Sequence, residues 1–166
     1  MIALKITSVK SFMSSVLKGN TFDNFLLKEA SVSTALTHNI DGHINRDFFS
    51  KEEQTTENIS YEYIKWADFK STCFEMIKGK RSPVFFRFVL LLMPDIAQML
   101  LKSKNCIVDA DHVEAMVLNI RFSSNIITIT TGLAYSTFVM SKEPDNIWDE
   151  YIIGFLNSQN IEYEIM

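Results

Sequence analysis

The sequence has little of what marks a secreted, flexible or catalytic protein. Its 166 residues include only two cysteines, five glycines and three prolines. A chain so poor in glycine and proline lacks the composition of disordered tails or flexible linkers. Because 47% of the residues are apolar and 12% are aromatic, the chain can bury a sizeable core. We therefore expect one domain, 1–166, that is folded nearly from end to end.

Cysteine usage and hydropathy predict the compartment of the protein. Cys73 and Cys106 form no CxxC pair, which favours reduced, structural thiols. The first residues lack the charged segment and the continuous apolar core of a signal peptide. The longest apolar run, 84–93, contains Arg87 and is far shorter than the roughly 20 residues that span a bilayer. These features predict a cytoplasmic protein without a membrane partner.

Motifs for common chemistries are also missing. The sequence contains no GxSxG nucleophile elbow, no HExxH zinc motif and no phosphate loop ending in GK[ST]. The net charge of −4 and the pI near 5.4 argue against attraction of the whole protein to nucleic acid, but they leave room for a local basic patch. The sequence therefore favours a protein that is not an enzyme and holds no cofactor.

The spacing of apolar residues predicts an α+β fold. Alternating apolar residues over 1–7 indicate a half-buried strand, and apolar residues at helical spacing over 8–18 indicate the clearest helix of the chain. Further helices are predicted over 66–77, over 94–102 and from Asp145 or Asn146 onward. Further strands are predicted within 25–45 and over 84–93, 113–122, 126–131, 133–140 and 161–165, the last as an edge strand.

One pattern, a strand followed by a helix and then by two strands that meet near a glycine, occurs twice. The glycines lie in the dipeptides Asp41-Gly42 and Thr131-Gly132, which predict tight turns. The pattern indicates an internally duplicated domain with antiparallel sheets and helices packed on one side. The predicted parts are a first copy over about 1–49, a loop over 50–62, a second copy with an extra helix over about 63–140, and a C-terminal helix and strand over 144–166.

An acidic segment is the most metal-like grouping of the chain. It comprises Asp109, Asp111, His112 and Glu114. It lacks the glycine and the distal glutamate of a calcium loop, and its spacing is not that of a zinc motif. A solvated loop before a strand is the simpler interpretation, so a metal site remains an alternative.

Basic residues gather in the predicted helices although the whole chain is acidic. In the first helix Lys10 and Lys18 lie on the side away from the apolar stripe. Such a surface can follow a phosphate backbone, although cations near helix C-termini also complement the helix dipole. The glycine-containing turn 78–81 could hold phosphate or could simply end a helix. The candidate nucleic-acid-binding residues are Lys10, Lys18, Lys78, Lys80, Arg81, Lys102 and Lys104.

The order of these segments resembles one domain of the DNA sliding-clamp, or processivity-fold, family. The segments are MIALKIT, SVKSFMSSVLKGN and FLLKEASVSTALTHNIDGHIN, then FFRFVLLLM, PDIAQMLLKSKN and MVLNIRFSSNIITITTGLAYSTF. The resemblance implies paired helices on a positively charged inner face, which would carry over to Lys10, Lys18, Lys102 and Lys104. The extra helix near Trp66, the C-terminal helix and the single-domain length depart from that family.

A second resemblance lies at the level of residues. The stretches YIKWADFKSTCFEMIKGKRSP and MIALKITSVKSFM resemble an uncharacterised family of short cytosolic proteins from anaerobic Gram-positive bacteria. This resemblance implies a bacterial protein and carries no function.

The sequence leaves two functions open. The favoured one is a noncatalytic, clamp-like binding module that contacts nucleic acid through its basic helical face or a partner protein through a sheet edge. The alternative is a small enzyme or a protein that binds a metal or phosphate ligand through loop 109–114 or turn 78–81. The oligomeric state stays open, a homo-oligomer included.

Overall fold

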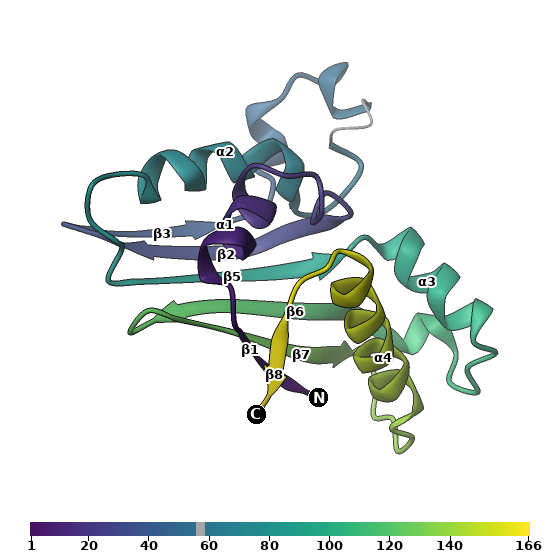
Figure 1. Ribbon diagram of the computed structural model, residues 1–166. Coiled ribbons are helices and arrows are strands. Elements are labelled where there is room, and N and C mark those ends of the chain that lie inside the picture. The colour runs from purple at the N-terminus through teal and green to yellow at the C-terminus, as the bar shows by residue number, and fades with distance from the viewer. Residues whose placement is uncertain (56–58) are drawn as a thin grey trace.

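The computed structural model describes residues 1–55 and 59–166, and its central element is an antiparallel sheet (Figure 1). In the described residues the sheet has eight strands, in the order β3-β2-β5-β6-β7-β1-β8, and β4 pairs with β2 beside this path. The sheet thus ends at β3 and β8. The strands are β1 (Ala3–Ile6), β2 (Phe25–Ser33), β3 (Thr37–Asp41), β4 (Ile64–Lys65), β5 (Phe85–Leu92), β6 (Val113–Ser123), β7 (Ile126–Tyr135) and β8 (Tyr163–Ile165).

Four α-helices connect these strands within the described residues. They are α1 (Val9–Leu17), α2 (Trp66–Ile77), α3 (Pro94–Ser103) and α4 (Glu143–Ser158). Short 3₁₀ turns are η1 (Arg46–Phe48), η2 (Glu53–Thr55) and η4 (Ala110–His112). The predicted α+β class with antiparallel strands is therefore confirmed, and all four predicted helices are present. Helix α4 begins two or three residues earlier than predicted, because Pro144 is well accommodated in a first helical turn.

One face of the sheet carries the core. In β5 the side chains of Phe86, Phe88 and Leu90 are buried on this face. Arg87, between the first two, points to the other face and is exposed. Their cross-strand partners in β6 follow the same alternation. Helices α1, α2 and α4 contribute large side chains to the same core cluster, whereas the opposite face bears the ion pair of Arg87 with Glu29. These helices thus cover one face of the sheet. The other face is exposed at Arg87, but it buries Leu26, Val89 and Leu91, which lie outside that core cluster.

Two tryptophans fix the covering helices. Trp66 of α2 and Trp148 of α4 are both fully buried. The Trp66 Nε1–H donates to the Val16 carbonyl of α1 at 2.9 Å, and the Trp148 Nε1–H donates to the Val117 carbonyl of β6 at 3.0 Å. Because a buried indole N–H left without a partner is costly, these bonds position α2 on α1 and α4 on the sheet.

Both predicted glycine turns are wrong. The chain reverses between β2 and β3 at residues 34–36, and Asp41-Gly42 lies at the end of β3. Thr131-Gly132 lies inside β7, where Gly132 pairs with Val117, so the two predicted strands there are one. The β6–β7 turn is instead Ser124-Asn125, with φ of 53° and 62°. Asparagine tolerates this left-handed region, which is why no glycine is needed there.

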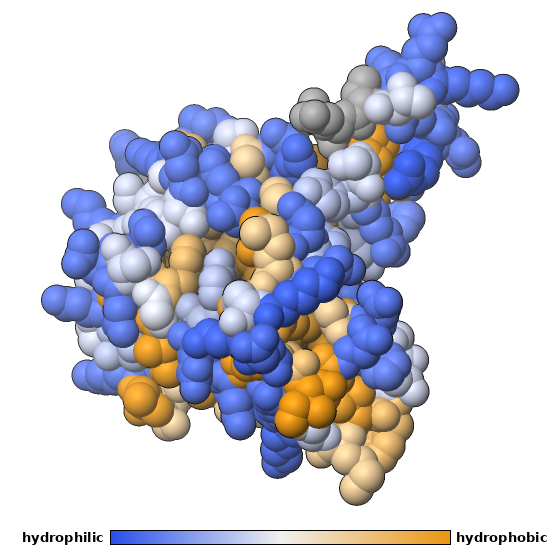
Figure 2. Space-filling view, turned by 90° about the vertical axis from the view of Figure 1, so that its right-hand side faces the viewer, coloured by the Kyte–Doolittle hydropathy of each residue, from blue (hydrophilic) through white to orange (hydrophobic). Residues whose placement is uncertain are grey.

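The described part of the segment between β3 and β4 projects from the sheet. Figure 2, turned by 90° from Figure 1, shows it as an arm with mostly hydrophilic atoms. The Gln54 side-chain amide holds part of this segment by donating to the carbonyls of Arg46 and Phe49. Within the predicted loop 50–62, η2 is a short 3₁₀ turn, and residues 56–58 lie outside the described part of the chain.

Gly42 occupies a position that no other residue fits. Its N–H donates to the Lys28 carbonyl at 2.8 Å, and its carbonyl accepts from the Ile64 N–H at 2.9 Å. A Cβ atom on Gly42 would lie 1.8 Å from the Leu27 carbonyl oxygen. Gly42 therefore allows the end of β3 to approach β2 closely.

We expect Gly42→Ala to lower the free energy of unfolding by about 3 kcal/mol, because backbone must move to admit the new Cβ. The matched control is Gly154→Ala in α4, where a Cβ would meet no atom within 4 Å. This control should raise stability by about 0.5–1 kcal/mol through helix propensity. Urea unfolding followed by circular dichroism measures both, and equal stability of the two variants would contradict the assignment.

Candidate functional site

An apolar groove of about 380 Å³ lies between α1 and α2. Its floor includes Phe86 and Phe122, whose rings stack with centroids 5.0 Å apart. Phe12, Val16 and Leu17 of α1 are buried, whereas Val9 and Met13 are only partly buried and line the groove. The apolar lining residues are Val9, Met13, Leu17, Phe74, Ile77, Pro83, Phe86 and Phe122.

Three lysines of the predicted basic set line this groove, namely Lys10, Lys18 and Lys78. The Lys18 ammonium lies 4.6 Å from the centroid of the Phe74 ring, a cation–π contact. The Lys78 ammonium pairs with Glu75 at 2.5 Å. All three lysines are exposed, and the exposed Lys80 and Arg81 follow directly after the groove residue Lys78. The structure therefore joins a local excess of positive charge to an apolar surface.

Lys102 and Lys104 do not belong to this groove. Both lie at the C-terminal end of α3, which contacts β6 and η4, whereas α1 contacts α2 (Figure 1). The Lys104 ammonium is 3.8 Å from the carboxylate of Glu150 on α4. The predicted basic face is thus divided between two regions of the molecule.

The acidic segment 109–114 forms the turn η4 and the start of β6. The Asp109 carboxylate accepts from the Asp111 N–H at 3.2 Å, which stabilises this turn. Asp109, Asp111, His112 and Glu114 are all exposed. Within residues 1–55 and 59–166, no group of three or more histidine, cysteine, aspartate or glutamate side chains is placed to hold a metal ion. The geometry therefore adds no support to a metal site in this segment.

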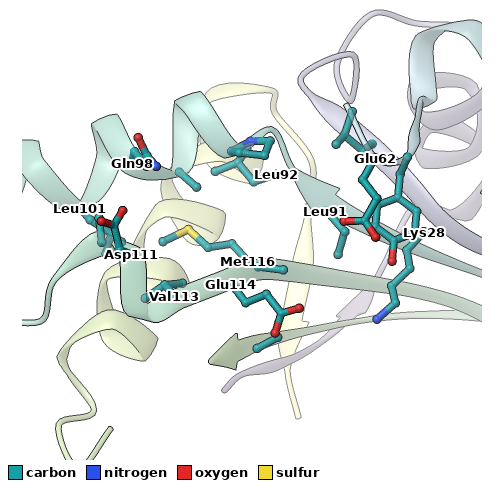
Figure 3. A pocket seen from close by; sticks show the side chains of 17 residues that line it. Lys28, Glu62, Leu91, Leu92, Gln98, Leu101, Asp111, Val113, Glu114 and Met116 are labelled. Atoms are coloured by element: carbon teal, nitrogen blue, oxygen red, sulfur yellow. The ribbon is translucent and has the colours of Figure 1, made fainter. Parts of the chain in front are cut away.

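Asp111 and Glu114 do line a second hollow, a cleft of about 320 Å³ shown in Figure 3. Its walls come from α3, from the neighbouring ends of β5 and β6, and from Glu62 and Tyr63 before β4. Lys28 of β2 completes the polar end of the cleft. Sequence analysis missed Lys28, Glu62 and Tyr63, because none of them belongs to a motif.

The carboxylates around the cleft act on one titratable group. Burial is the largest cause that raises the pKa of Tyr63 above its ordinary value, and the carboxylates of Glu62, Asp41 and Glu114 raise it further. Glu62 also lies 3.5 Å from the His43 Nε2, and the His43 ring meets Tyr63 edge-on. The polar end of the cleft is therefore a region of negative potential.

Comparison with protein families gives one match. The model of DUF5721, described as a family of unknown function, matches residues 15–164. The chain belongs to this family. The match covers α2, α3 and α4 in full, and it confirms the expected membership of an uncharacterised family. No curated protein and no solved structure matches the chain. None of the described helices is both long and apolar enough to cross a membrane.

The cysteines of this DUF5721 member are not activated nucleophiles. Cys73 of α2 is fully buried, and burial raises the pKa of its thiol to about 12. Burial is also the main cause that raises the pKa of Cys106, and Glu143 adds to it. Since the thiolate is the reactive form, neither cysteine is set up for catalysis.

We expect an alkylating reagent at pH 8 to leave Cys73 unmodified in the folded protein and to modify it after unfolding, as judged by mass spectrometry.

The same thiol makes stability fall at high pH. The Cys73 thiol has a pKa of 9.0 in the unfolded chain, and this pKa is raised to about 12 in the folded protein. The free energy of unfolding should therefore fall by about 1.4 kcal/mol at pH 10 from this group. Cys73→Ala should lack this part of the pH dependence, and an unchanged dependence would contradict the assignment.

Proposed function

We propose that this protein is a noncatalytic binding module whose α1–α2 groove takes an acidic, amphipathic helical segment of a partner protein. The observation that carries the proposal is the combination of an apolar floor with three lysines, Lys10, Lys18 and Lys78, in a chain whose net charge is −4. Charge complementarity selects an acidic partner, and the apolar floor selects one with hydrophobic anchors.

The apolar lining of the groove suits a helix with hydrophobic anchors at i, i+3 and i+4. Met13 and Leu17 supply one apolar wall from α1, and Phe74 and Ile77 supply the other from α2. The side chains of these apolar residues are buried or partly buried, whereas the three lysines beside them are exposed. An amphipathic helix would place its apolar face between the walls and its carboxylates near the ammonium groups.

The same features favour a protein partner over nucleic acid. A duplex is held mainly by cations that contact successive phosphates and gains little from an apolar floor. Lys102 and Lys104, which a clamp-like surface would need, lie away from the groove, and Lys104 is next to Glu150. A sheet-edge contact has less support, because β3 has five residues and β8 has three, and short edge strands limit strand addition.

We infer that any likeness to a clamp domain, and any internal duplication, is confined to the order of the elements. The orders β1-α1-β2-β3 and β5-α3-β6-β7 repeat a strand, a helix and two strands. This repeat supports a shared origin of the two halves. The proposed binding groove does not depend on it, because α1 pairs there with α2, which has no counterpart in the first half.

The test is fluorescence anisotropy with a labelled acidic amphipathic peptide of about 15 residues, the length at which a helix becomes marginally stable. A peptide of the same composition in scrambled order is the ligand control, and labelled duplex and single-stranded DNA are run in parallel. We expect saturable binding of the amphipathic peptide that weakens as salt is raised. Lys10→Glu combined with Lys18→Glu should weaken it roughly tenfold or more.

Lys102→Glu is the control, since it reverses a lysine charge on α3, outside the groove. It should leave peptide binding unchanged. A second groove variant, Ile77→Ser, tests the apolar floor without a change of charge, and circular dichroism checks that each variant is folded. Equal binding of the scrambled peptide, or equal losses with Lys102→Glu, would overturn the proposal. DNA binding that is lost with the Lys10 and Lys18 changes would replace it with the nucleic-acid function.

A further inference from the structure

The cleft of Figure 3 is a separate hollow, on different elements from the groove. It lies between α3 and the ends of β5 and β6, and its floor includes Leu26 and Leu91, which pair across β2 and β5. At about 320 Å³ it is near the lower end of the range of small-molecule sites. A ligand that fills it is therefore small.

Small side chains create the cleft. Four alanines line the hollow, namely Ala97 of α3, Ala110 of η4 and the sheet residues Ala115 and Ala134. Ala115 and Ala134 are direct cross-strand partners on β6 and β7. Larger residues at these positions would fill the space, so the open volume results from the choice of alanine.

The polar end of the cleft is built by an irregular backbone. The pairing of β2 with β5 shifts register between Leu27 and Glu29, which places Lys28 in a bulge. Gly42 allows the chain after β3 to approach this bulge, with its N–H bonded to the Lys28 carbonyl. Bulges of this kind re-aim a side chain and occur next to functional sites. Lys28 thereby lines the cleft together with Glu62 and Glu114.

The charges that line the cleft are unequal. Three carboxylates, those of Glu62, Asp111 and Glu114, stand against the single ammonium of Lys28. In Figure 3 Lys28 and Glu62 lie at one end of the cleft and Asp111 and Gln98 at the other, with Glu114 and apolar side chains between them. Burial is the largest cause of the raised pKa of Tyr63, and the carboxylates of Glu62 and Glu114 add to it.

We propose that this cleft binds a small organic cation, a primary amine carried on an apolar stem. The stem would lie on Leu26 and Leu91 between the alanine walls, and the ammonium group would donate to the carboxylates of Glu62 and Glu114. Hydrogen bonds between an ammonium and a carboxylate are among the stronger ones. An anionic ligand of the same shape would meet the excess of carboxylates and is excluded by repulsion.

The test uses hexylamine and hexanoate, two probes with the same number of carbon atoms and opposite charge. Ligand-observed NMR at neutral pH should show saturable binding of hexylamine and none of hexanoate. Glu114→Gln, which keeps the size of the side chain and removes its charge, should weaken hexylamine binding roughly tenfold. Ala134→Leu should abolish it by filling the cleft, and Ala97→Leu on the opposite wall is a second variant in case Ala134→Leu does not fold.

Lys10→Glu, in the α1–α2 groove, is the control and should leave hexylamine binding unchanged. The proposal is overturned if hexanoate binds as well as hexylamine, or if hexylamine binding survives both Ala134→Leu and Ala97→Leu in folded protein. Because the peptide and the amine are tested with variants on different elements, failure of either proposal can be told apart from failure of the other.

Discussion

The structure depends on the need to bury one face of a single antiparallel sheet. Alternate residues of β5 from Phe86 to Leu92 and of β6 from Met116 to Phe122 are apolar and fully or almost fully buried, so this face must be covered. Helices α1, α2 and α4 provide the cover, and the indole bonds of Trp66 and Trp148 fix where they lie. One candidate site is the space between α1 and α2 within this cover. The other lies beside α3 at an end of the sheet, over Leu26 and Leu91, which are outside the core cluster.

The elements of this fold could be predicted from local patterns, whereas their connections could not. Helix α1 and strand β5 follow directly from the spacing of their apolar residues. The turns were misplaced because Gly42 and Gly132 serve other purposes. Gly42 allows the backbone at the end of β3 to lie close to the Leu27 carbonyl. Gly132 of β7 is paired directly with Val117 of the neighbouring strand β6. A glycine in a sequence can mark an unusual backbone conformation or a place where a side chain would not fit. Only the folded structure shows which of the two applies.

The same limit applies to the sites. Lys10 and Lys18 could be predicted as neighbours because helical spacing places them on one side of α1. The sequence could not show that Lys78 joins them, or that Lys102 and Lys104 do not, because this depends on which helix packs against α1. The grouping of the residues at the polar end of the cleft could not be predicted from the sequence at all. Lys28 and Glu114 are far apart in the chain, and a bulge brings Lys28 to the cleft.

The two sites carry opposite charge, and this gives the acidic average of the chain a physical meaning. The net charge of the chain is −4, but lysines line the groove between α1 and α2 and carboxylates line the cleft beside α3. Since exposed charges farther apart than about 8–10 Å are largely screened at moderate ionic strength, each site responds to its own local potential. An acidic peptide is therefore attracted to the groove although the protein as a whole is acidic, and a cation at the cleft leaves that attraction almost unchanged. The separation of charge on the surface, rather than its sum, decides what this fold can bind.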